Sequence, residues 1–216
     1  MTNLFSVFDP VTGLLSLNWI STIIFLLMIP NKFWFLNNKI NMIFSNIMKI
    51  LEKEMFMLMP YKGTTMIMLT LFLFILINNI MGLMPYVFTS SSHLIYSMSL
   101  AMPIWLALML YGWVNKYNMM FSHLVPTGTP AILMPFMVMI ETISNLIRPG
   151  SLSVRLTANM IAGHLLMSLL GNNTESMIMM MSAMLLYIVL MMFEFAVAMI
   201  QSYVFMTLMT LYSSEI

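Results

Sequence analysis

The sequence predicts an all-α integral membrane protein with about five transmembrane helices and one amphipathic helix on the membrane surface. Of its 216 residues, 61% are hydrophobic and only 7% are charged, whereas ordinary soluble domains carry roughly 25% charged residues. Its uncharged runs are long enough for several spanning helices, each of which needs about 20 apolar residues. We therefore expect residues 1–216 to form a single integral membrane domain. Because the chain contains no cysteine, thiol chemistry and disulfide bonds are excluded.

The first predicted span covers about residues 14–30, because no charged residue lies between Asp9 and Lys32 and Pro30 ends the run. A lysine-rich stretch follows it. Within about residues 39–55, isoleucines recur at helical spacing while the lysines fall largely on other faces. This pattern is typical of a helix that lies on the membrane surface, so we expect an interfacial helix here.

The second and third predicted spans cover about residues 64–82 and 94–113. No Asp, Glu, Lys or Arg occurs from Gly63 to Asn115, and this run is long enough for two membrane helices. The polar segment 82–93 supplies the turn between them.

The last two predicted spans, about 135–170 and 177–212, are each 36 residues long. A helix of that length measures about 54 Å, whereas the hydrocarbon core of a bilayer is about 30 Å thick. The final run contains no Gly or Pro that could divide it. We therefore expect two long, strongly tilted, antiparallel helices joined near residues 171–175.

The distribution of lysines predicts the orientation of the chain. Lysines cluster in residues 32–62 and at Lys116, whereas segments 83–93 and 171–176 carry none. By the positive-inside rule, and with five spans, the N-terminus faces the outer compartment and the C-terminus faces the inner one.

Arg155 is a charged residue deep inside a predicted span. A guanidinium stays protonated, and an arginine at the centre of a membrane helix costs about 2.5–3.5 kcal/mol. Asn159 lies one turn later on the same face, and small residues nearby, such as Gly163, allow close approach by another helix. We interpret Arg155 as functional. The alternative is an arginine that extends along the helix to the membrane surface.

Three further polar residues lie in the last two spans. His164 faces nearly opposite to Arg155, and its imidazole could relay protons or simply hydrogen-bond a neighbouring helix. Glu194 and Gln201 lie seven residues apart on one face of the final helix. Glu194 could exchange protons, or it could be a static partner of Arg155 or His164.

Glu141 lies early in the fourth predicted span and could serve the opposite side of the membrane. Alternatively it pairs with Arg148, seven residues later, provided that Pro149 leaves the helix straight. We interpret Arg148 itself, beside Pro149 and Gly150, as structural.

The sequence contains no nucleophile triad, phosphate-binding glycine loop or metal-ligand cluster. We therefore expect no catalytic residue, no cofactor and no metal site. A net charge of +1 gives no reason to expect a nucleic-acid partner. Protonatable groups around one fixed cation favour proton transport.

A family resemblance is carried by the runs PTGTPAILMPFMVMIETISNLIRPGSLSVRLTANMIAGHLL (126–166) and FEFAVAMIQSYVF (193–205). These runs closely resemble subunit a of mitochondrial F-type ATP synthases, and the segment RLTANMIAGH is highly specific. The likeness extends to NLFSVFDP near the N-terminus and LYSSE near the C-terminus, so it covers essentially the whole chain.

This resemblance implies that the chain is the stator half of a rotary proton channel in the mitochondrial inner membrane. The chain is then no enzyme on its own. It implies an N-terminus toward the intermembrane space and a C-terminus toward the matrix. The implied partners are a rotating ring of c-subunits that each bear one carboxylate, the peripheral stalk, other Fo membrane subunits, the lipid bilayer and protons.

The resemblance also implies a role for each polar residue of the last two spans. Arg155 matches the arginine that faces the ring and separates two offset half-channels, with Asn159 one turn beyond it. His164 and Glu194 match a pair that lines the inlet half-channel from the outer side. By the same resemblance, Gln201 lies near the inlet path and Glu141 is the acid of the outlet half-channel toward the matrix.

Two other classes of protein stay open at this point. A self-contained channel or transporter would place its site at the midplane on broken helices and would often show inverted repeats, which we do not find. A purely structural membrane subunit would use Arg155 and Glu194 as a static pair.

Overall fold

The computed structural model describes residues 4–11, 16–23, 27, 29, 38–59, 62–125, 130–172 and 177–214. Helices and short connections account for all of these residues, so the predicted all-α class is confirmed. In chain order the helices are η1 (Leu4–Phe8), η2 (Leu17–Ile23), α2 (Lys39–Leu58), α3 (Lys62–Gly82), η3 (Ser90–Ser92), α4 (Leu94–Asn115), α5 (Tyr117–Leu124), η4 (Ala131–Leu133), α6 (Met134–Asn172) and α7 (Met177–Ser214).

Four described helices, namely α3, α4, α6 and α7, are long and apolar enough to cross a membrane. They correspond to the four later predicted spans. The first predicted span, over 14–30, is described only at residues 16–23, 27 and 29, and its longest described helix is the 3₁₀ helix η2. The count of five spans, and the orientation that depends on it, therefore stay predictions.

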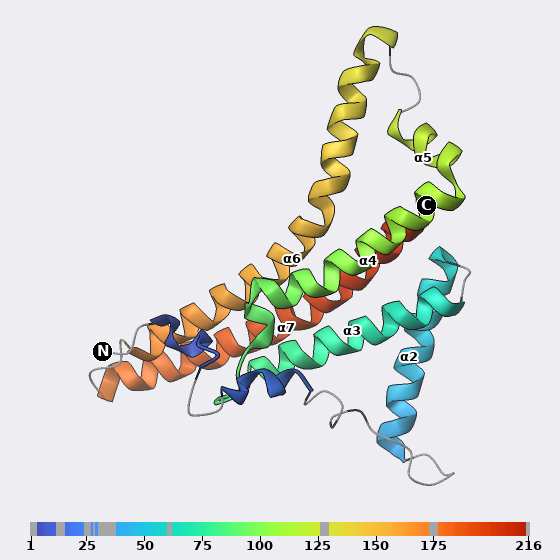
Figure 1. Cartoon of the computed structure of the whole chain (residues 1–216). Coiled ribbons are helices and arrows are strands. Elements are labelled where there is room, and N and C mark those ends of the chain that lie inside the picture. The colour runs from blue at the N-terminus through green and yellow to red at the C-terminus, as the bar shows by residue number, and fades with distance from the viewer. Residues whose placement is uncertain are drawn as a thin grey trace.

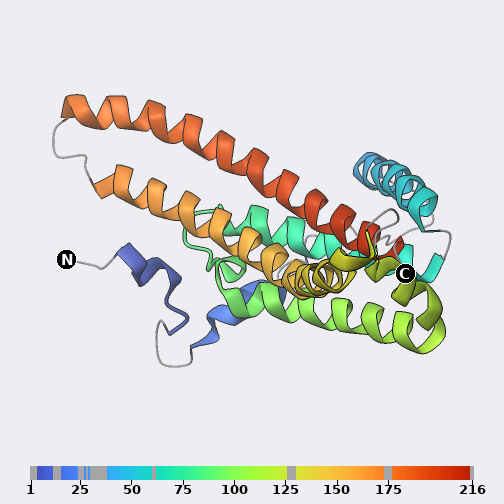
Figure 2. The same cartoon turned by 90° about the horizontal axis from the view of Figure 1, so that it is seen from above.

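The bundle is built from α3, α4, α7 and the C-terminal half of α6, which run side by side (Figures 1 and 2). The helices α6 and α7 contain 39 and 38 residues and contact one another as an antiparallel pair, as predicted. Figure 1 shows that α6 bends between its yellow N-terminal part and its orange C-terminal part. A bend is expected near Pro149, because proline removes one backbone donor and its ring clashes with the preceding turn.

The predicted surface helix over 39–55 is present as α2, which lies at a steep angle to α3 (Figure 1). It packs against α3 and α7. Its isoleucines Ile40, Ile43 and Ile47 remain exposed, so this apolar face is free for contact with lipid or a partner. The short helix α5 was not predicted from the sequence.

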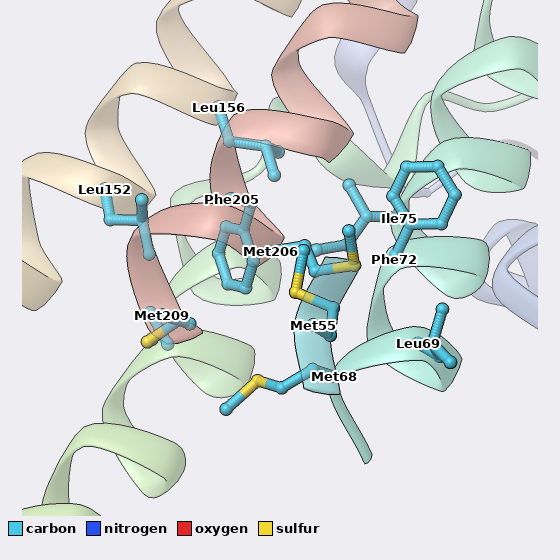
Figure 3. Close-up of a cluster of buried hydrophobic side chains, with 11 residues drawn as sticks. Met55, Met68, Leu69, Phe72, Ile75, Leu152, Leu156, Phe205, Met206 and Met209 are labelled. Carbon is cyan, nitrogen blue, oxygen red and sulfur yellow. The ribbon is translucent and has the colours of Figure 1, made fainter. Parts of the chain in front are cut away.

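The largest buried cluster lies where α2, α3, α6 and α7 meet (Figure 3). Methionine fills much of it, because a flexible thioether adapts to irregular gaps between helices. Its members are Met55, Met68, Leu69, Phe72, Ile75, Ala101, Leu152, Leu156, Phe205, Met206 and Met209. In contrast, only 11% of the most apolar 18-residue stretch of α7 is buried within the chain. A helix that is apolar all round needs lipid or another protein to cover it.

Candidate functional site

Arg155 lies on the outward face of α6. Its neighbours Leu152 and Leu156 are buried in the core at 1% and 0% exposure, whereas Arg155 and Val154 are exposed. Within the described part of the chain, no carboxylate forms an ion pair with its guanidinium. The fold therefore directs a permanent cation toward whatever covers this face, and it does not neutralise it internally.

Asn159, one turn beyond Arg155, connects the two long helices. Its side-chain Nδ2 donates a hydrogen bond to Oε1 of Gln201 on α7, at 3.2 Å. Gln201 is 5% exposed, and its Nε2 has no hydrogen-bond partner among the residues the structure describes. This cross-helix bond was not predicted from the sequence, because it depends on how far α6 and α7 slide past one another.

Glu194 reaches from α7 to the α6 segment that contains His164. Its carboxyl group lies directly against Gly163, where any side chain would overlap it. Glu194 is only 5% exposed. The prediction that small residues here allow close approach is thus confirmed at Gly163, and this glycine is what admits the acid.

His164 is half-buried, and a residue from the far N-terminal part of the chain approaches it. The ring of Phe8, in η1, meets the imidazole edge-on with 6.2 Å between ring centroids. The Nε2 atom of His164 is buried without a hydrogen-bond partner in the described ranges. No sequence signal indicated Phe8, because the two residues are far apart in the chain.

Glu141 and Arg148 lie near the opposite end of α6. Their side chains form an ion pair at 3.4 Å, so the pairing that the sequence left open is present, just before Pro149. The guanidinium of Arg148 also lies over the ring of Tyr212 on α7, 4.9 Å from its centroid. All three side chains line one cavity of about 480 Å³.

These groups divide α6 into two regions with Arg155 between them. Arg155 lies 14 residues after Glu141 and nine before His164, which corresponds to about 21 Å and 14 Å along a straight helix. The order along α6 is therefore a carboxylate in a cavity, a fixed cation on an exposed face, and a buried acid and imidazole. Such an arrangement can hold protons at two separate places and cannot pass one through the cation itself.

In the described residues, no three His, Cys, Asp or Glu side chains gather closely enough to hold a metal ion.

Comparison with known proteins identifies the family. The family model described as ATP synthase A chain matches residues 11–214. The chain is 59% identical to ATP synthase subunit a of Drosophila simulans, and the match covers 100% of this chain and 99% of the relative. With the same coverage it is 58% identical to ATP synthase subunit a of Drosophila melanogaster and 55% identical to that of Anopheles quadrimaculatus. The chain therefore belongs to the ATP synthase A chain family, as a non-catalytic, proton-translocating stator subunit of the Fo sector.

Proposed function

We propose that Arg155 is the divider of the proton path through this subunit, and that it faces a rotating ring of carboxylate-bearing c-subunits. The observation that carries this proposal is the exposed guanidinium on a candidate membrane-spanning helix, with no internal carboxylate paired to it in the described residues. Keeping such a charge in a membrane costs about 2.5–3.5 kcal/mol. A passing carboxylate on another subunit would offset this cost, because the guanidinium favours its ionised form.

On the inlet side, Glu194 and His164 are the groups that take up the proton. Three observations support this role: the carboxyl group of Glu194 packs on Gly163, the neighbouring imidazole has a free buried Nε2, and Gln201 presents an unpaired buried amide nitrogen within the described structure. Buried polar atoms of this kind normally bind water. Asn159, one turn beyond Arg155 on α6, hydrogen-bonds Gln201 of α7.

On the outlet side, Glu141 is the acid that accepts protons from the ring. Its position in a cavity, about 21 Å along α6 from Arg155, supports a separate aqueous path. Moving one elementary charge through 100 mV is worth about 2.3 kcal/mol, so a direct leak from inlet to outlet would waste that energy. A cation that never releases its proton prevents the leak.

The subunit works inside the Fo complex of the mitochondrial inner membrane, against the c-ring, with the peripheral stalk, other Fo subunits and lipid covering its remaining faces. The uncovered apolar surface of α7 supports such neighbours. The N-terminus faces the intermembrane space and the C-terminus faces the matrix. This orientation follows from the positive-inside rule and from a spanning helix near residues 14–30.

The experiment replaces Arg155 by Ala in the intact complex, reconstituted in liposomes. Arg155→Ala should abolish proton-driven ATP synthesis while the complex still assembles, and passive proton leak should rise. Lys49→Ala, which removes a cation from the exposed side of α2, is the matched control and should leave both rates unchanged. Coupled synthesis retained in Arg155→Ala would contradict the proposal and favour a purely structural subunit.

A second measurement tests the reading as a self-contained channel. Liposomes that contain this chain alone should show no proton conductance above that of empty liposomes, because the path is completed only by the ring. Conductance by the isolated chain would overturn the rotary role.

A further inference from the structure

Three contacting groups line the cavity beside the N-terminal part of α6: the ring of Tyr212 contacts the guanidinium of Arg148, which pairs with the carboxylate of Glu141. We propose that Arg148 and Tyr212 form a clamp that positions the carboxylate of Glu141 at the cavity wall. Both are positioning residues in this inference, which rests on the proposed outlet role of Glu141. Arg148 is then a functional residue that the sequence had suggested to be structural.

The geometry of Arg148 connects the other two groups. Its Nη2 lies 3.4 Å from Oε1 of Glu141, and its central carbon Cζ lies 4.9 Å from the centre of the Tyr212 ring. A planar guanidinium can stack on an aromatic face while its edge donates to a carboxylate, which a lysine ammonium cannot do in the same way. The ring therefore fixes the plane of the guanidinium, and the guanidinium in turn fixes the carboxylate.

The clamp joins two helices that reach the cavity from distant parts of the chain. Glu141 and Arg148 lie about two turns apart on α6, both before Pro149, whereas Tyr212 comes from the last turns of α7. Pro149 is buried and has no backbone N–H, so α6 can bend here. The contact with Tyr212 of α7 holds the side chain of Arg148 in one place beside this bend.

Most of the remaining cavity wall is apolar. Trp105 and Trp113 of α4 form part of it together with leucine and methionine side chains, and Thr142 and Asn145 of α6 add two uncharged polar side chains. Apart from Arg148 and Tyr212, the titratable group that lines the cavity with Glu141 is His123 of α5. A carboxylate beside apolar walls needs a donor to hold it, because burying an unpaired charge is costly. Among the cavity-lining groups, Arg148 forms an ion pair with Glu141.

The test uses the intact ATP synthase in liposomes and measures proton-driven ATP synthesis per assembled complex. Tyr212→Leu removes the ring face, and it should lower the rate about three- to tenfold, the range expected for loss of a cation–π contact. Tyr212→Phe keeps the ring and should restore most of the rate. Tyr187→Leu is the matched control, since it makes the same change on α7 outside the cavity lining, and it should have little effect.

Arg148→Gln provides the second variant, because it removes the charge while nearly keeping the length of the side chain. It should lower the rate at least as much as Tyr212→Leu, and the two changes together should cost no more than Arg148→Gln alone. If the complex with Tyr212→Leu fails to assemble, the variants Arg148→Gln and Arg148→Lys still test the clamp. Arg148→Lys should recover only part of the rate, because lysine keeps the charge without the planar fork.

Glu141→Gln separates failure of the clamp from failure of the outlet assignment. If Glu141→Gln leaves synthesis intact, the proposed outlet role is wrong. If it abolishes synthesis but Tyr212→Leu and Arg148→Gln do not lower the rate, the clamp alone is wrong. In a Glu141→Gln background neither clamp variant should lower the amount of assembled complex, whereas a merely structural role would still destabilise the complex there.

Discussion

Glu194 and Glu141, the two acids that lie beside opposite parts of α6, are held in opposite ways. Glu194 is 5% exposed and lies against Gly163, with no cation paired to it in the residues described. The side chain of Glu141 is 37% exposed, faces a cavity and pairs with Arg148. The proposed inlet acid, Glu194, thus depends on available space, and the proposed outlet acid, Glu141, depends on a neighbouring charge. Added volume should therefore harm the inlet, while altered charge or screening should harm the outlet.

The largest effect is expected from adding volume at the inlet. Gly163→Val would place two methyl groups where the Glu194 carboxyl lies, so this carboxyl must move. Overpacking of this kind typically costs about 1–3 kcal/mol, which corresponds to a loss of about five- to a hundredfold in rate. Proton-driven ATP synthesis by the reconstituted complex is the measurement.

Gly171→Val is the matched control, because a Cβ at that position near the end of α6 meets no atom of the described residues within 4 Å. The double variant Gly163→Ala with Glu194→Asp sharpens the test, since a shorter acid makes room for one methyl group. It should be more active than Gly163→Ala alone. Equal loss in the variants at 163 and 171 would show that the inlet acid does not depend on this space.

A smaller effect is expected from the hydrogen bond between Asn159 of α6 and Gln201 of α7. Asn159→Leu and Gln201→Leu each remove one partner of the 3.2 Å bond, and a net hydrogen bond contributes about 0.5–1.5 kcal/mol. Each single variant should therefore lose about two- to tenfold in synthesis rate. The double variant should lose little more than either single one. Fully additive losses would mean that the two amides act independently.

The parts of the fold that the sequence predicted are those that composition or one helix alone determines. Spans α3, α4, α6 and α7 follow from uncharged runs, because transfer into lipid depends on apolar length. The ion pair of Glu141 and Arg148 was one of two alternatives that the sequence left open, since residues seven apart on one helix share a face.

Contacts between helices could not be predicted from the sequence, because they depend on register and packing. The carboxyl of Glu194 on Gly163, the ring of Tyr212 under Arg148 and the edge of Phe8 on His164 all join distant segments. The helix α5 has only eight residues, too few for a clear helical period, and isolated helices of this length are marginal without packing partners. It lies against α4 and α6, so tertiary contacts support it.

The smallest effect, and the most direct comparison of the two ends, comes from ionic strength. Raising a membrane-impermeant salt from about 0.1 M to about 1 M shortens the Debye length from about 10 Å to about 3 Å. A partly exposed ion pair contributes about 0–1 kcal/mol, so salt on the outlet side should slow synthesis by less than about fivefold. Salt on the inlet side should change the rate much less, because Glu194 is buried without a paired cation in the described chain. Arg148→Gln should remove the asymmetry, since the pair that salt screens is then absent. An equal response from both sides in the unaltered complex would mean that charge pairing does not distinguish the two acids.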